Sequence, residues 1–249
     1  MRCRFCDQDK PALAKAHVIP RSFFKRVRGA AKYSVELHVS ENGIKEKPEQ
    51  AGHYDCNILC EECERKFSPY DAHGHSVFTK VFEKPNIYRD DDGFECAYLL
   101  PDVNYALFKL FVLSVLWRAS VSQLPFYRNV HLGQSHEDRI KSLIDGGSIE
   151  GGGIYQFVCS HQKNAPYPKS IVPPEPHKID GINFVHLYLP DIDIVVKVDK
   201  RPIPDFLRKL VITPKPPHYM LLFPSKRSNV SSYIDEMRAA MRKAKWPTK

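Results

Sequence analysis

The sequence predicts an α+β fold, because three stretches of the 249-residue chain carry three different patterns. Two C-x-x-C pairs lie in the first stretch, and an apolar helical pattern follows in the second. In the third, short runs of branched and aromatic residues alternate with Pro-rich turns, which is typical of strands. We therefore expect a zinc-bearing module at 1–80, a connector with buried helices at 81–150, and a β-rich region of unknown role at 151–249.

The central stretch predicts two helices. Between residues 102 and 123 apolar side chains fall on every side of a helical wheel, as expected of a helix buried in the centre of a domain. Asp102 is the expected N-cap and Pro125 ends the helix. A second helix is expected at 137–144, whereas residues 81–101 are expected to form a connector because proline and an Asp-Gly turn interrupt them.

The last stretch predicts an antiparallel sheet with a terminal helix at 231–245. The predicted strands are 154–160, 182–189, 192–198, 207–213 and 219–223.

Composition narrows the class of protein. With 43% hydrophobic and 27% charged residues the chain is an ordinary globular protein, which excludes a disordered tail or a fibre. The 37 Lys+Arg exceed the 29 Asp+Glu and give a net charge of +8, which favours an anionic partner and nucleic acid before a membrane. Many basic proteins bind no such partner, so the charge alone does not decide the question.

The chain shows neither a membrane span nor an export signal. Its richest apolar run, residues 110–117, is too short to cross a bilayer, and the first six residues contain no apolar core. We expect a cytoplasmic protein.

The cysteines predict a structural zinc site. The chain contains seven cysteines, an odd number, and no export signal, so disulfides are not expected. Cys3 and Cys6 form one C-x-x-C pair, and Cys60 and Cys63 form a second. Two such pairs commonly supply the four thiolates of a tetrahedral zinc site. A redox role competes, but neither pair follows a strand in a recognisable βαβ unit.

Two segments near these pairs carry a motif. They read Ala16-His17-Val18-Ile19-Pro20-Arg21 and Tyr54-Asp55-Cys56-Asn57-Ile58-Leu59-Cys60. Together with the cysteines they resemble the HNH endonucleases of the ββα-metal superfamily, whose zinc-bearing members carry C-x-x-C, a histidine followed by Ile/Val-x-Pro, and N-L-x-x-L-C-x-x-C-H. The resemblance covers about residues 1–75, and residues 116–120 and 130–133 are also similar to HNH-type bacterial proteins. It implies a treble-clef-like ββα-metal module.

The resemblance also implies a mechanism, the hydrolysis of phosphodiester bonds with a divalent ion such as Mg²⁺ or Mn²⁺. His17 occupies the place of the general base, and a neutral histidine suits that role near pH 7. Asn57 matches the family's asparagine by identity, whereas Asp55 matches it by spacing, so both remain candidate catalytic residues. Asp55 and Glu64 are the candidate oxygen ligands of the ion, Glu64 standing where the family has a histidine.

Ala16 departs from the family, because many members have a metal-binding Asp or His at this position. Asp55, Asp71 or His53 could supply the missing ligand. If none does, the chain is a non-catalytic zinc module that binds nucleic acid, or a scaffold in which zinc serves folding alone.

Basic residues surround the predicted base and fit a surface that holds a phosphate backbone, although a solvated charged face fits them as well. These residues are Lys15, Arg21, Lys25, Arg26 and Arg28. The expected partner is nucleic acid, with DNA favoured over RNA. Cleavage of both strands would need a homodimer or two successive binding events by one protein molecule.

Two further features allow more than one interpretation. Arg118 lies in the apolar helix and needs a partner if it is buried, for which paired core structure is favoured over a bound phosphate. His73 and His75 resemble a metal-binding pair, but a flexible turn fits their segment equally.

Overall fold

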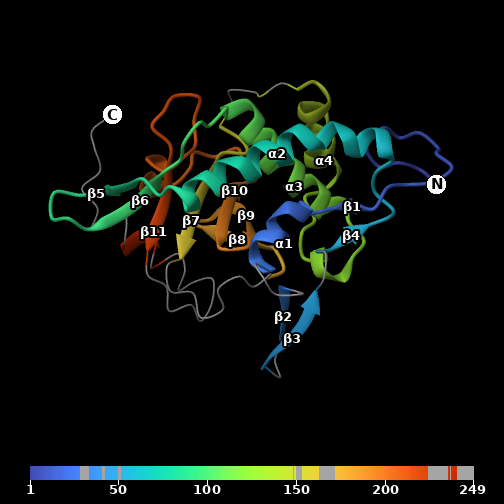
Figure 1. The fold of residues 1–249 in the computed structure, drawn as a ribbon. Helices are drawn as coiled ribbons and strands as arrows, with labels where there is room; N and C mark the ends of the chain where they lie inside the picture. Colours follow the sequence, from blue (N-terminus) through green and yellow to red (C-terminus); the bar gives the residue numbers. More distant parts are fainter. Residues whose placement is uncertain are drawn as a thin grey trace.

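The computed structural model describes residues 1–28, 34–40, 43–49, 52–147, 149, 153–162, 172–223, 235 and 237–239. Its main sheet has seven strands (Figure 1). Its order is β5-β6-β11-β7-β10-β9-β8. The strands are β5 (Ile87–Arg89), β6 (Glu95–Leu99), β7 (Phe157–Gln162), β8 (Glu175–Ile179), β9 (Ile182–Leu189), β10 (Ile192–Lys197) and β11 (Tyr219–Phe223). The expected α+β class is confirmed, and β9 and β11 have the predicted bounds.

The prediction of a purely antiparallel sheet was wrong at one pair. β11 pairs with β7 in parallel and with β6 antiparallel, so it joins the C-terminal strands to a hairpin from the middle of the chain. Which strand lies beside β11 depends on the whole chain and cannot be seen in the local alternation of residues.

Residues 81–101 are not a connector, because they contain the hairpin of β5 and β6. The polar run that suggested a connector is the turn of this hairpin. Asp90 Oδ1 accepts hydrogen bonds from the backbone N–H of Asp92 at 3.1 Å and of Phe94 at 2.9 Å, and Gly93 adopts a φ of +80°.

The predicted strand at 207–213 is also wrong. The short helix α5 (Asp205–Arg208) begins after Pro204, and the residues after it form no strand. Leu207 and Leu210 are buried, so their apolar character reflects packing against the sheet and not strand pairing. The expected helix at 231–245 lies mostly outside the described residues, although residues 235 and 237–239 are helical.

Helix α3 (Tyr105–Val121) is the buried central helix that the sequence predicted, with every residue from 108 to 121 buried. It begins later than expected. Asn104 is the N-cap, and its side chain accepts a hydrogen bond from the Leu107 N–H at 3.2 Å, whereas Asp102 adopts a positive φ of 50°. A 3₁₀ turn (Pro125–Tyr127) and α4 (Gln134–Asp145) follow, and α4 begins three residues before its predicted start.

Helix α2 (Glu61–Glu83) packs against α3 and continues through His73 and His75, so the flexible turn considered for this segment is wrong. Gly74 allows the close approach of the two helices, because a Cβ there would lie 2.5 Å from the Phe111 ring. His73 does not pair with His75, since its Nε2 accepts a hydrogen bond from the Asn104 N–H at 3.1 Å.

The N-terminal region supplies two small strands before α2. β1 (Ala16–His17) pairs antiparallel with β4 (Tyr54–Asp55), and α1 (Arg21–Arg28) and the hairpin of β2 (Ser34–Ser40) and β3 (Gly43–Glu49) lie between them in sequence. In Figure 1 this hairpin projects from the rest of the molecule. The order strand, strand, helix agrees with the expected module, although it does not by itself identify an HNH fold.

A single hydrophobic core runs through all three predicted stretches of the chain. It includes Phe5 near the N-terminus, Trp117 on α3, and Ile194 and Leu222 in the sheet. A second cluster packs on the other face of the sheet. None of the described helices is long and apolar enough to cross a membrane.

Candidate functional site

Four cysteine side chains converge at the N-terminus of α2. The Sγ atoms of Cys3, Cys6, Cys60 and Cys63 all lie within 4.8 Å of one another, and those of Cys6 and Cys60 are 4.0 Å apart. Tetrahedral zinc bound at a Zn–S distance of about 2.3 Å separates its sulfurs by about 3.8 Å. The four thiols therefore fit a metal ion such as zinc, as the sequence predicted.

Local structure brings the two pairs together. Cys3 and Cys6 lie in a tight turn that is closed by the Asp7 N–H donating to the Cys3 carbonyl at 3.0 Å, with Asp7 at a positive φ of 57°. Cys60 is the N-cap residue of α2 and Cys63 lies in its first turn. The positive end of the helix dipole favours thiolates at both positions.

Backbone N–H groups favour the thiolate of Cys3 in particular. Burial alone would raise the pKa of this thiol, but N–H groups including that of Cys60, at 3.3 Å from Sγ, outweigh burial and lower the pKa to about 7. Burial and the neighbouring thiols raise the pKa of Cys63. The cluster thus already holds one sulfur that loses its proton readily.

The two-stranded ribbon of β1 and β4 places the predicted site residues on two different faces. His17 lies opposite Tyr54, and Ala16 lies opposite Asp55. Because residues opposite each other in an antiparallel pair share a face and adjacent residues alternate, His17 and Asp55 point to opposite sides. Ala16 and Asp55 are buried, whereas His17 is half-buried and Tyr54 is exposed.

The face of His17 carries an exposed aromatic and a cation. Tyr54 is 42% exposed, its ring lies 5.9 Å from the His17 imidazole, and Lys15 Nζ lies 5.5 Å from the centre of the same ring. Tyr54 carries no signal in the sequence, because only the strand pairing places it beside Lys15 and His17.

Asp55 is bound inside the protein. Its Oδ1 accepts the Asn57 N–H at 2.8 Å, and its Oδ2 accepts the Ser122 hydroxyl at 2.9 Å and the Gln123 N–H at 3.0 Å. These bonds tie β4 to the end of α3. They occupy both Asp55 oxygens, which the sequence had suggested as ligands of a divalent ion. No local pattern in the sequence indicated Ser122 or Gln123 as partners.

Glu64 lies on α2 one residue after the cysteine pair and is half-buried. Its Oε2 is buried and has no hydrogen-bond partner among the described residues. Burial raises the pKa of this carboxyl, and Asp71 raises it further, while the positive charge of Arg118 opposes both. Asn57, in contrast, is exposed beside the end of β4.

Arg118 organises the space between these elements. Its guanidinium is fully buried and holds Asp71 through two hydrogen bonds of 2.7 and 3.0 Å, which confirms the expected core pair. It also donates to the His17 carbonyl oxygen at 2.8 Å and lies 5.3 Å from the Phe67 ring. Arg118 therefore fixes the backbone of β1 against α2.

The substitutes considered for the missing ligand at Ala16 have other contacts. Asp71 is held by Arg118, and the His53 ring stacks on Phe126 with centroids 4.1 Å apart. In the part of the chain that the structure describes, the four cysteines are the only group of three or more ligand atoms close enough to hold an ion. A divalent ion would therefore need Glu64, Asn57 and ligands from water or substrate.

The predicted nucleic-acid contacts fall on two elements. Lys15 and Arg21 are exposed, Lys15 just before β1 and Arg21 at the start of α1. Lys25, Arg26 and Arg28 lie on α1, and their side chains are outside the described part of the structure.

Comparisons with protein-family models, with curated proteins and with solved structures gave no significant match. The likeness to HNH endonucleases therefore remains a resemblance of motifs, and function has to be argued from the site.

Proposed function

We propose that the chain is a metal-dependent endonuclease of the HNH type, which hydrolyses phosphodiester bonds of nucleic acid, DNA before RNA. The observation that carries the proposal is the ribbon face with Lys15, His17 and Tyr54, which lies next to a helix anchored by four cysteines. Lys15 and Tyr54 are exposed on this face, and His17 is half-buried there with its Nε2 buried. A cation, an aromatic ring and an imidazole on one face suit a nucleic acid, because they can meet a phosphate, a base and an attacking water.

His17 is the general base of the proposal. A neutral imidazole accepts a proton from water near pH 7 while the water oxygen bonds to phosphorus. The bond from phosphorus to the leaving oxygen breaks, and that oxygen takes a proton from solvent. The hydrogen bond from Arg118 to the His17 carbonyl and the pairing with Tyr54 hold the strand that carries the ring. Arg118 is thus a positioning residue.

A bound Mg²⁺ or Mn²⁺ would stabilise the charge that develops on the phosphate and on the leaving oxygen. Glu64 is the best-placed ligand for such an ion, since its buried carboxylate oxygen accepts no hydrogen bond from the described residues and would gain from a nearby cation. Asn57 is exposed and can offer its amide oxygen. Asp55, predicted as a ligand or catalytic residue, serves in this proposal to position the Asn57 loop through its bond to the Asn57 N–H.

Zinc on Cys3, Cys6, Cys60 and Cys63 has a structural role in the proposal. It ties the N-terminal turn to the start of α2, the helix that carries Glu64. A protein of this kind cuts one strand at a time, so cleavage of both strands requires a homodimer or two successive binding events by one protein molecule.

A second candidate is a zinc module that binds nucleic acid without cutting it. The engagement of both Asp55 oxygens inside the protein favours it, and so does the alanine at position 16. Both candidates use the same basic and aromatic face, so they differ only in chemistry.

The test is a nicking assay on supercoiled plasmid with zinc-loaded protein and no other ion, with Mg²⁺, or with Mn²⁺. Wild type should nick only with added Mg²⁺ or Mn²⁺, and His17→Ala should not. Lys215→Gln, which removes an exposed side chain outside the module, should nick as wild type does. Plasmid that is retarded on a gel but intact under every ion would favour the binding module.

Salt dependence separates both candidates from a scaffold that uses zinc for folding only. Phosphate contacts by Lys15 and Arg21 make nucleic-acid affinity fall steeply as salt rises. A scaffold would show negligible affinity for DNA and RNA at moderate salt.

A further inference from the structure

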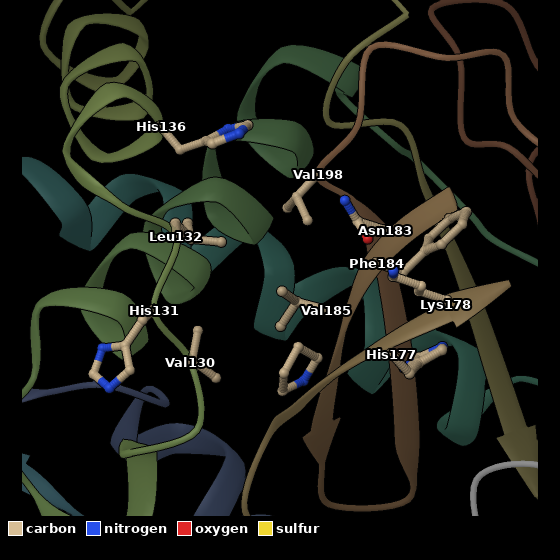
Figure 2. Close-up of a pocket in the computed structure, with 11 residues that line it drawn as sticks. Val130, His131, Leu132, His136, His177, Lys178, Asn183, Phe184, Val185 and Val198 are labelled. Carbon is tan, nitrogen blue, oxygen red and sulfur yellow. The ribbon is translucent and has the colours of Figure 1, made fainter. Parts of the chain in front are cut away.

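A pocket of about 370 Å³ lies between the loop that precedes α4, the first turn of α4 and the β8–β9 edge of the sheet (Figure 2). This volume is within the range of small-molecule binding sites. None of the residues assigned to the nuclease site lines it.

The floor of the pocket is apolar. Val130 and Leu132 come from the loop, Val185 comes from β9, and Val198 directly follows β10. Figure 2 shows these four side chains around one hollow. Such walls favour a ligand with a flat or aliphatic body, because they exclude water from it.

Polar groups stand on two opposite sides of this floor. Lys178 and Asn183 face each other across the β8–β9 pair, and both are exposed. His136 stands on the opposite side, on α4, where its Nδ1 lies 2.8 Å from the Tyr155 hydroxyl. That contact fixes the ring and leaves Nε2 available to a ligand.

His177, which also borders the pocket, does not share this arrangement. It alternates with Pro176 and Lys178 along β8, so its side chain points to the other face of the sheet, and its ring centre is 5.6 Å from that of His186.

Lys178 is the only Lys, Arg, Asp or Glu among the described residues that line the pocket. Arg139 and Lys200 are close enough that, after burial, they are the next causes that lower the pKa of His136. The nearby carboxylate of Asp199 accepts a hydrogen bond from the Asn183 N–H at 3.1 Å, and Arg201 pairs with it at 2.6 Å. Because that carboxylate is paired, the charge of Lys178 favours an anionic ligand.

We propose that this pocket binds a nucleotide, with its phosphate on Lys178 and the neighbouring Asn183 amide, its base on the apolar floor, and the edge of the base on His136 Nε2 across the floor. A nucleotide uses all three parts, whereas an aliphatic anion would leave unused the imidazole nitrogen of His136. The site does not depend on the nuclease proposal. The same chemistry is presented by a free nucleotide and by an unstacked nucleotide in a single strand.

The test is calorimetric titration of the full chain with each of the four nucleoside 5′-monophosphates, with the matching nucleosides and with inorganic phosphate. It uses His17→Ala protein without added divalent ion, so that cleavage plays no part. At least one monophosphate should bind saturably and more tightly than its nucleoside or than phosphate. Lys178→Gln and His136→Gln should each weaken binding about tenfold.

Lys215→Gln is the matched control, because it removes one exposed lysine that does not line the pocket, and it should bind as the parent does. A short single-stranded oligonucleotide that competes with the monophosphate and depends on Lys178 would identify a strand as the source, and failure to compete would identify the free nucleotide. Failure of every monophosphate to bind, equal binding of the nucleosides, or binding unchanged by both pocket variants would overturn the proposal.

Discussion

At the scale of single residues, the buried Arg118 guanidinium is the most demanding group in the protein, because a charge without contact to water needs its partner. Asp71→Ala should lower the free energy of unfolding by about 3–5 kcal/mol, since it leaves that charge unpaired. Urea unfolding at constant m-value measures the loss.

The double variant Arg118→Met with Asp71→Leu is the control for this prediction. Removing both charges removes the cause of the instability, so the double variant should recover about half of the loss or more. A single variant as stable as wild type would show that Asp71 does not neutralise Arg118.

Glu64 gives a prediction on pH. Burial raises the pKa of this carboxyl above its ordinary value of 4.5, so the folded state binds the proton more tightly than the unfolded state. Its contribution to stability is therefore favourable at low pH, and it declines as pH rises from the unfolded pKa through the raised folded pKa.

Glu64→Gln removes this decline. With zinc bound and no other divalent ion, the variant should be more stable than wild type at pH 7, and the difference should vanish below pH ~4. Chemical unfolding across this pH range measures the difference in stability. A variant that is less stable than wild type at pH 7 would contradict the claim that burial disfavours the charged form of Glu64.

At the scale of elements, the four-cysteine cluster joins the N-terminal turn to α2. We expect about one zinc per chain by elemental analysis, and Cys63→Ala should lose it, because three thiolates hold a structural zinc poorly. Cys56→Ser is the matched control, since Cys56 is near the cluster in sequence but not part of it. Equal metal content in both variants would disprove the site.

Some helices and strands could be predicted from the sequence, and others could not. Helix α3 and the strands β9 and β11 were predicted because their own residues carry the periodicity. Helix α2 was not, because Pro69 and Gly74 interrupt its pattern, and its contact with α3 explains the glycine only in three dimensions.

Only part of the candidate site could be predicted from the sequence. The four cysteines were predicted from their spacing alone, and a partner for a buried Arg118 was expected, although its identity was not. The pairing that puts Tyr54 beside His17, and the contacts of Asp55 with Ser122 and Gln123, join segments far apart in the chain. No local pattern encodes such contacts.

At the scale of the whole molecule, one core connects the N-terminal module, the central helices and the sheet. The chain should therefore unfold in one transition. Trp117 packs on Phe5 and Phe67 at centroid distances of 5.4 and 6.1 Å, so its fluorescence reports the N-terminal part, while far-UV circular dichroism reports all elements.

The two probes should give coincident urea curves in a Trp246→Phe background, which leaves Trp117 as the single tryptophan. Two separated transitions would instead indicate that the module at 1–80 folds as an independent domain.

The central claim is that His17 acts in chemistry and not in binding. The most direct measurement records affinity and cleavage rate on one labelled DNA duplex with Mg²⁺, for wild type and for His17→Ala. We expect the variant to bind within about threefold of wild type and to cut at least about 100-fold more slowly, as for the loss of a general base. Equal cleavage by both proteins, or no cleavage by wild type with Mg²⁺ or Mn²⁺, would contradict it.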